Sequence, residues 1–336
     1  MASCCAGEGA CGILAFGVLS LTRDFHWALV RTRQEKQAPQ TDRLPAPWRA
    51  TLTRRTAIVT DSTACIPLDL AETLNVETIP LFLTFGDEAY QDGVSERAGE
   101  FYERLRTAEQ PPTTAAPSPG AYAEAILRAG RAADSVLAVT VSRQFSAMYD
   151  AAAQGAALAR EQAPALDIRV LDSGAAAMAQ GFVVLEAARA AANGSAIEDV
   201  LARAGEVMPK VQLLVVLDTL FYLGRTGRVP RLVVWASSPL QLKPIVEFHR
   251  GSYRPVTMVR TMRRATDKLF RVLEQRVRGK ALHVCVQHTN VPAAADALAK
   301  RVSEALQPKE LMVQEFTQVM GVHTGPGLLG FSFYTE

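Results

Sequence analysis

Three short, mostly apolar segments, each followed at once by hydroxyl or carboxylate residues and then by a helical pattern, constrain this fold most. They are residues 56–60, 135–141 and 168–171. Apolar runs of this length are typical of strands buried on both faces of a sheet. The polar residues behind them suit the first turn of a helix. This alternation predicts an α/β domain with a doubly wound, mainly parallel sheet.

Ligands of such sheets bind at the carboxyl ends of the strands. Those ends carry Asp61 with Ser62, then Ser142, then Asp172 with Ser173. These residues are therefore candidates for anion or partner contacts. Asp61 and Ser62 also suit a structural role, because their side chains can accept hydrogen bonds from the free N–H groups of a helix start. Both interpretations stay open at this point.

The four prolines of residues 111–120 predict a stiff loop without regular structure, and Ser118 is expected to cap a helix over residues 119–131. Residues 76–85 are expected to form one strand. After residue 210 the pattern changes to a mixed α+β domain, with a long amphipathic helix over residues 256–278. We therefore expect three parts: a poorly ordered N-terminal extension over 1–55, an α/β domain over 56–210 and a mixed α+β domain over 211–336.

The last polar segment of the chain combines a histidine and a hydroxyl with a glycine-rich turn. His323 and Thr324 precede Gly325-Pro326-Gly327, and apolar runs flank them on both sides from Val319 to Tyr334. We expect a strand, a turn and a strand that present the imidazole, the hydroxyl and backbone N–H groups to an anion. The alternative is a tight turn that the histidine merely caps.

Charge, cysteine content and hydropathy argue against nucleic-acid binding, a metal site and membrane insertion. The net charge is +2, and residues 1–55 hold eight Lys and Arg against four Asp and Glu, so the remainder is slightly negative and does not favour nucleic-acid binding. The five cysteines lack zinc-ligand spacing, which predicts no metal site and favours a reducing cytoplasm. The apolar run from Gly12 to Leu21 has about half the length of a membrane span, so no stable membrane insertion is expected.

Sequence motifs of cofactor-dependent enzymes do not occur. The chain has no P-loop, no Gly-x-Gly-x-x-Gly and no Gly-x-Ser-x-Gly, so no cofactor and no catalytic residue is predicted. A hydrolase triad of Ser142, His323 and Asp61 is conceivable but lacks the strained turn that exposes such a nucleophile. Arg225 and Arg228 flank a glycine turn and suit either solvent exposure or an anion clamp.

Eight short blocks, in order over residues 56–336, resemble the DegV family of bacterial fatty-acid-binding proteins. Each block is weak alone, but their common order makes chance agreement improbable. The blocks are residues 58–63, 90–93, 112–120, 140–149, 171–173, 217–228, 242–245 and 323–330.

The resemblance implies two α/β domains that hold a long-chain fatty acid between them, with the acyl chain in an apolar tunnel. It implies that Thr114, Ser142 and His323 bind the carboxylate, with Thr324 and Gly325 adjacent. It further implies a carrier that is not itself an enzyme and that presents the fatty acid to a separate ATP-dependent fatty acid kinase subunit. The product would be an acyl phosphate for phospholipid metabolism.

The chain departs from the family pattern near the presumed head group. Ala115 and Ala116 replace a serine and a glutamine, and Arg143 replaces the second of two serines. Arg143 adds a cation that could pair with the carboxylate or change the ligand. We therefore keep two alternatives to the carrier. One is an acyl hydrolase or transferase that uses Ser142 and His323, and the other is a small-anion sensor that uses Arg143 and Arg225.

Overall fold

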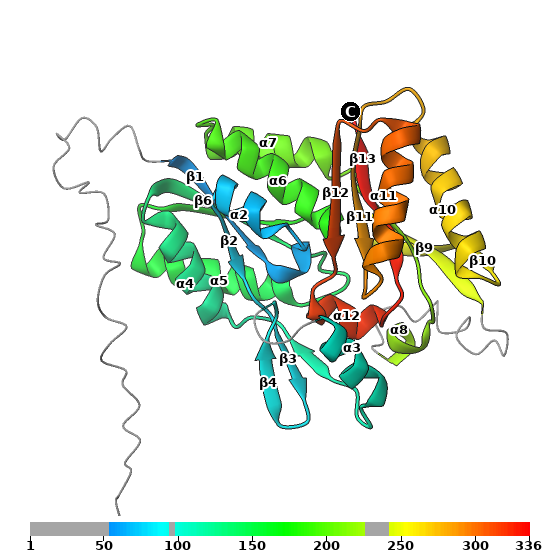
Figure 1. The fold of residues 1–336 in the computed structure, drawn as a ribbon. Helices are drawn as coiled ribbons and strands as arrows, with labels where there is room; N and C mark the ends of the chain where they lie inside the picture. The colour runs from blue at the N-terminus through cyan, green and yellow to red at the C-terminus, as the bar shows by residue number, and fades with distance from the viewer. Residues whose placement is uncertain (1–53, 94–97, 226–241) are drawn as a thin grey trace, which may run out of the picture. The chain divides into compact units, whose positions relative to one another are not determined.

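A computed structural model describes residues 54–93, 98–225 and 242–336 of the chain (Figure 1). The predicted extension over residues 1–55 lies almost entirely outside the described residues, as does Arg228. Within the described ranges, no helix combines the length and apolar character needed to cross a bilayer. The described residues all belong to one compact unit, so the predicted division into two domains at residue 210 stays a prediction.

The first sheet is parallel and has the strand order β2-β1-β6-β7. Its strands are β1 (Arg54–Asp61), β2 (Val76–Ile79), β6 (Ala133–Thr140) and β7 (Asp167–Asp172). One face is covered by α4 (Pro119–Gly130) and α5 (Met148–Gln162), and the other by α2 (Leu68–Leu74), α6 (Met178–Ala192) and α7 (Ile197–Val207) (Figure 1). The doubly wound prediction is confirmed. The strand order reverses between β1 and β6, which is where such sheets bind ligands.

The second sheet is mixed and has the order β10-β9-β8-β13-β11-β12, with only β11 and β12 parallel. Its strands are β8 (Gln212–Val216), β9 (Lys243–His249), β10 (Ser252–Val259), β11 (Leu282–His288), β12 (Glu310–Glu315) and β13 (Leu329–Thr335). On one face lie α10 (Met262–Val277) and α11 (Pro292–Leu306). This confirms the mixed α+β pattern after residue 210.

Helix α6 packs against strands of both sheets and belongs to their shared core. Its sequence explains this position, because Ala, Val, Leu, Met and Phe occur on every side of the helix and nearly all of them are buried. A helix that is apolar all round has to be enclosed. The first helix turn therefore reaches the junction between the two sheets, where the cavity described below lies.

A third, small sheet and three short helices complete the structure beside this junction. The sheet has the order β4-β3-β5, with β3 (Phe82–Phe85), β4 (Glu88–Gln91) and β5 (Thr113–Ala115). Helix α12 (Gln318–Thr324) contacts both α3 (Ala98–Thr107) and α8 (Phe221–Arg225), and these helices lie together below the second sheet in Figure 1.

Two predictions about proline-containing segments were wrong. Residues 76–85 form two strands in different sheets, β2 and β3, because Pro80 lacks an N–H group and interrupts the ladder. The loop over 111–120 does contain regular structure, since β5 fits between its prolines and pairs with β3. The predicted cap is confirmed: the Ala121 N–H donates to Ser118 Oγ (3.2 Å) at the start of α4.

Two further segments differ in type from the prediction. The long helix over residues 256–278 is strand β10 followed by α10, because the segment up to Val259 pairs with β9 and Thr261 caps the helix. The strand-turn-strand at the C-terminus is a helix, a turn and a strand, since residues 318–324 form α12. Periodicity alone does not separate a short apolar strand from a buried helix.

Candidate functional site

An apolar cavity lies where the carboxyl ends of β1 and β6 face the second sheet. It contains about 790 Å³ of space not filled by atoms, part of it open to solvent. The first 180 residues contribute Thr63, Leu81, Thr114, Val141, Phe145, Ser146, Met148 and Ala176 to its wall. The C-terminal part contributes Leu213, Val215, Leu217, Leu223, Phe248, Phe316, Val319, Met320, His323, Thr324 and Leu328.

Two polar side chains form a pair at one end of this cavity. Thr114 Oγ1 lies 3.3 Å from His323 Nε2, within hydrogen-bonding distance. The same two residues also line an outer pocket with about 740 Å³ of empty space, where Tyr222 and Arg225 contribute polar groups. The Thr114–His323 pair therefore stands at the boundary between an apolar cavity and a more polar pocket. A ligand with a long apolar part and one anionic head matches this arrangement.

A rigid turn holds His323 at this boundary. Gly325, directly after α12, has a φ of +69°, and a Cβ on it would lie only 2.1 Å from Tyr222 Cδ2, so the position requires glycine. Thr289 Oγ1 donates to the Gly325 carbonyl (2.7 Å) and accepts from the Leu328 N–H (2.8 Å). Gly325 acts here through its backbone conformation, and Thr324 is a buried part of the cavity wall.

The start of α12 is held by a buried carboxylate. Asp92 Oδ1 accepts from the Val319 N–H (3.0 Å), and Asp92 Oδ2 accepts from Ser62 Oγ (2.6 Å). Ser62 Oγ in turn accepts from the Leu81 N–H (3.2 Å). Burial raises the pKa of Asp92 above its ordinary value. Ser62 and Asp92 therefore connect the end of β1 to the helix that carries His323, which places Ser62 in a positioning role.

Asp61 joins the ends of β1 and β6. Its Oδ1 accepts from the N–H (3.1 Å) and the hydroxyl of Thr63, and its Oδ2 accepts from the Val141 N–H (3.1 Å) and from Gln180 Nε2 (3.2 Å). The predicted capping role is confirmed. Burial raises the pKa of the Asp61 carboxyl. Because Thr63 and Val141 line the cavity, Asp61 stabilises its wall.

Ser142 and Arg143 lie outside the cavity lining. Ser142 is buried, its N–H donates to the Ala175 carbonyl (2.8 Å), and its Oγ accepts from the Gln144 N–H (3.3 Å). Ser146, four residues later, is the serine of this turn that lines the cavity. The Arg143 guanidinium is exposed, pairs with Asp150 (3.4 Å) and stacks on the Tyr149 ring. Contacts of Ser142 and Arg143 with a ligand stay a prediction.

Of the two arginines expected to form an anion clamp, only Arg225 is among the described residues. It lines the outer pocket, and its guanidinium carbon lies 5.0 Å from the centre of the Phe221 ring. Tyr222 lies beside it, and burial raises the pKa of this phenol. The structure thus brings Thr114, His323 and Arg225 together in the lining of the outer pocket.

Several lining residues escaped the sequence analysis. Residues 213–217 form a continuous apolar run, which does not show that Leu213, Val215 and Leu217 border a cavity. Ser146 lies in the block over residues 140–149, in which the family resemblance implied Ser142 as the ligand. The role of Asp92 depends on a contact with Val319, 227 positions away in the chain.

The described residues contain no cluster of three or more His, Cys, Asp or Glu that could hold a metal ion. Cys65 and Cys285 are both buried free thiols. Burial raises the pKa of Cys65 to about 12 and that of Cys285 well above its ordinary value. Their thiolates are therefore disfavoured, and the two cysteines act as small buried hydrophobic residues.

Comparison with known proteins identifies the family. The model of the family described as "Uncharacterised protein, DegV family" matches residues 55–336. The chain belongs to the DegV family. A DegV domain-containing protein of Streptomyces coelicolor is 34% identical over 281 residues, which cover 83% of this chain and 98% of that protein. Protein DegV of Bacillus subtilis is 29% identical over 276 residues, covering 82% and 97%.

Solved structures of DegV proteins have the same fold. A DegV family protein from Thermus thermophilus, described by its fatty acid binding, matches with a TM-score of 0.77 at 27% identity, covering 84% of this chain and 100% of that chain. DegV from Bacillus subtilis, described as a fatty acid binding protein, matches with a TM-score of 0.75 at 28% identity and the same coverage. The two-sheet architecture thus occurs in solved DegV proteins that are described as binding fatty acids.

Proposed function

We propose that this DegV protein binds a long-chain fatty acid, with the carboxylate at Thr114 and His323 and the acyl chain in the apolar cavity. The observation that carries the proposal is the Thr114–His323 pair at the boundary between the cavity and the outer pocket. Fatty acid binding by the Thermus and Bacillus relatives supports the same ligand class.

The chemistry of the two groups suits a carboxylate. A carboxylate that leaves water has to be paired or well hydrogen-bonded. The Thr114 hydroxyl and a protonated His323 imidazole both donate hydrogen bonds, and a bond to a charged group contributes about 1.5–3 kcal/mol. The acyl chain adds about 0.8 kcal/mol for each buried CH₂ group. Affinity would come mostly from the apolar wall, and orientation from the polar pair.

The outer pocket supports a carrier that presents its ligand to a partner. The carboxylate at Thr114 and His323 would face Arg225 and Tyr222, so a second protein could reach it without displacing the acyl chain. We infer that the partner is an ATP-dependent fatty acid kinase subunit, which forms the acyl phosphate in the cytoplasm. Arg225 then offers a positive charge beside the group that receives the phosphoryl group.

The alternatives have less support. An acyl hydrolase would need an exposed Ser142 nucleophile, whereas Ser142 is buried and capped by its own turn. A small-anion sensor would use Arg143 together with Arg225. Arg143 is already paired with Asp150, and an apolar wall of this extent would serve no purpose for a small anion.

Native mass spectrometry of the purified protein, followed by denaturation and lipid identification, tests the proposal. We expect one fatty acid for each chain, lost on denaturation and restored when delipidated protein is mixed with free fatty acid. Protein that stays empty in both experiments would refute fatty acid binding. The partner is tested separately, by asking whether loaded protein gives a hydroxylamine-trappable acyl phosphate with a fatty acid kinase subunit and ATP; a loaded protein that gives none would refute presentation alone.

A further inference from the structure

The cavity has a defined far end, opposite the Thr114–His323 pair. Leu213 and Val215 lie on one face of β8, Leu217 directly follows the strand, and all three residues line the cavity. Leu217 lies beside the His323 end, because Val216 pairs with Leu329 of β13, directly after Leu328. At a rise of about 3.3 Å for each residue, Leu213 lies about 13 Å farther along the wall.

Two phenylalanines close that far end. Phe248 of β9 pairs directly with Leu213, and Phe145 comes from the turn after β6. Their rings meet edge to face, with centroids 5.8 Å apart and an interplanar angle of 75°. Both rings line the cavity and both are half-buried, so they stand between the cavity and solvent. On the outer side, the Tyr253 ring lies 6.2 Å from that of Phe248.

Backbone contacts fix the two segments that carry these rings. The Gly251 N–H, in the turn after β9, donates to the Gly174 carbonyl (2.6 Å) in the loop after β7. The Phe145 N–H donates to the Ser142 carbonyl (2.9 Å), which closes the turn after β6. Gly251 also packs against the side chains of Ser142 and Gln144. These contacts hold the segments that carry Phe145 and Phe248 in place. A bound ligand would therefore contact both rings in a fixed position.

We propose that Phe145 and Phe248 set the longest acyl chain that this protein accepts, by stopping the methyl end of the ligand. The inference rests on the proposed function, because it requires the carboxylate at Thr114 and His323. The ligand class is then a fatty acid whose extended part fits between the polar pair and the aromatic pair. The two rings exclude longer acyl chains. Shorter acyl chains leave the part of the cavity wall near Leu213 uncovered.

Truncation of either ring tests the proposal. Delipidated wild-type protein, Phe248→Ala, Phe145→Ala and the control Phe82→Ala are each mixed with an equimolar series of saturated fatty acids from dodecanoate to docosanoate. Phe82 is a partly exposed residue of β3 outside the cavity lining. Native mass spectrometry then gives the occupancy by each chain length. Each additional methylene buried in the opened cavity should tighten binding about fourfold.

We expect the occupancy of both cavity variants to move toward longer chains, and that of Phe248→Trp toward shorter ones, while Phe82→Ala keeps the wild-type distribution. An unchanged distribution in Phe248→Ala and Phe145→Ala, with fatty acid still bound, would overturn this inference and leave the proposed function intact. Wild-type protein that binds no member of the series would refute the proposed function instead. Phe145→Ala, at a turn, serves if Phe248→Ala fails to fold.

Discussion

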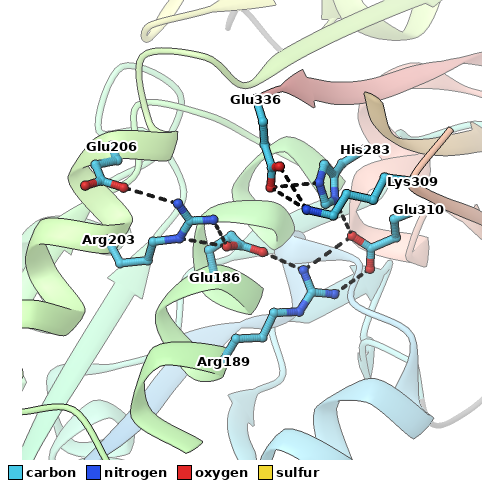
Figure 2. Close-up of polar contacts among 8 residues, drawn as sticks. All are labelled: Glu186, Arg189, Arg203, Glu206, His283, Lys309, Glu310 and Glu336. Atoms are coloured by element: carbon cyan, nitrogen blue, oxygen red, sulfur yellow. Dashed lines mark hydrogen bonds and ion pairs between the residues drawn. The ribbon is translucent and has the colours of Figure 1, made fainter. Parts of the chain in front are cut away.

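Two of the places where the two sheets meet have opposite chemistry. One is the cavity, whose wall is almost entirely apolar and carries a single hydrogen-bonded Thr114–His323 pair at its mouth. The other is a charged cluster between α6, α7 and the edge of the second sheet, shown in Figure 2. In the cluster the polar groups form ion pairs with one another, whereas the Thr114–His323 pair lines the cavity and the outer pocket.

Glu186 is the centre of the charged cluster. Its side chain is only 7% exposed and lies between Arg189 (2.5 Å) and Arg203. Arg189 also pairs with Glu310, whose carboxylate lies 2.8 Å from His283 Nδ1 (Figure 2). Burial raises the pKa of Glu186, but hydrogen bonds and ion pairs to Arg189 and Arg203 outweigh it and hold the pKa below the ordinary value.

The charged cluster and the cavity have different roles: the groups of the cluster stabilise the fold, whereas those of the cavity are available to bind a ligand. Each acid of the cluster already has a basic partner, so a further ligand would have to break an existing ion pair. A buried charge that is paired in this way stabilises the fold only as long as its partner remains. The cavity instead leaves apolar wall uncovered, and this is the surface that a ligand can occupy. Cluster variants should therefore change stability, and cavity variants should change binding.

The largest expected effect is on binding, in His323→Ala. Loss of a charge-assisted hydrogen bond should weaken fatty acid binding by about 10- to 150-fold, with little change in the free energy of unfolding. Isothermal titration of delipidated protein measures the first quantity and urea unfolding the second. His249→Ala is the matched control, because His249 bonds the Val211 carbonyl outside the cavity lining. If His323→Ala binds fatty acid as tightly as His249→Ala does, His323 does not bind the carboxylate.

Glu186→Gln should lower the free energy of unfolding by about 2 kcal/mol. This value lies between those for exposed and buried ion pairs, because the partners Arg189 and Arg203 are only partly exposed. Fatty acid affinity should stay unchanged. Urea unfolding of ligand-free protein measures the loss. The exposed pair of Lys300 and Glu304 offers a control, since Glu304→Gln should cost much less. A large drop in fatty acid affinity in Glu186→Gln would show that the charged cluster contributes to binding as well as to stability.

Variants of Asp92 test whether its hydrogen bond to the start of α12 positions His323 for binding. Asp92→Ala removes the acceptor for the Val319 N–H at the start of α12, and loss of such a cap costs about 0.5–2 kcal/mol. Because α12 carries His323, binding should weaken as well, by up to about tenfold. Asp92→Asn keeps an acceptor oxygen and should restore most of the affinity, as measured by the same titrations. If Asn behaves like Ala in binding, the cap does not position His323.

The smallest effect is a pH dependence of opposite sign in the two places. Glu186 has a lowered pKa, so its stabilisation is present above its ordinary value of 4.5 and is lost as pH falls through the folded pKa. Asp92 has a raised pKa, so its stabilisation is present below its ordinary value of 3.8 and is lost as pH rises through the folded pKa.

Urea unfolding at several pH values from acid to neutral measures both trends. On acidification, wild-type protein should lose its advantage over Glu186→Gln and should gain stability relative to Asp92→Asn. The expected outcome is the sign of each trend, because the folded pKa is lowered for Glu186 and raised for Asp92. Trends of equal sign would contradict the assignment of the two carboxyls.

Local chemistry was sufficient to predict most of the parallel sheet. The apolar runs of β1, β6 and β7, the Ser118 cap and the cap at Asp61 all follow from residues within a few positions of one another. Helix α11 likewise begins at Pro292 and ends at Leu306, as its pattern predicts. These features depend on capping, proline geometry and periodicity, which act within one or two turns of the chain.

The sequence by itself also determined the family, through the order of its blocks, and that resemblance implied Thr114, Ser142 and His323 as ligands of the carboxylate. Only the tertiary structure decided that residues 318–324 form a helix, since Asp92 caps it from 227 positions away. Only the tertiary structure placed Ser146, rather than Ser142, in the cavity wall and set Phe145 against Phe248. The reason is physical: a cavity is the space that several segments fail to fill together, and no single segment encodes it.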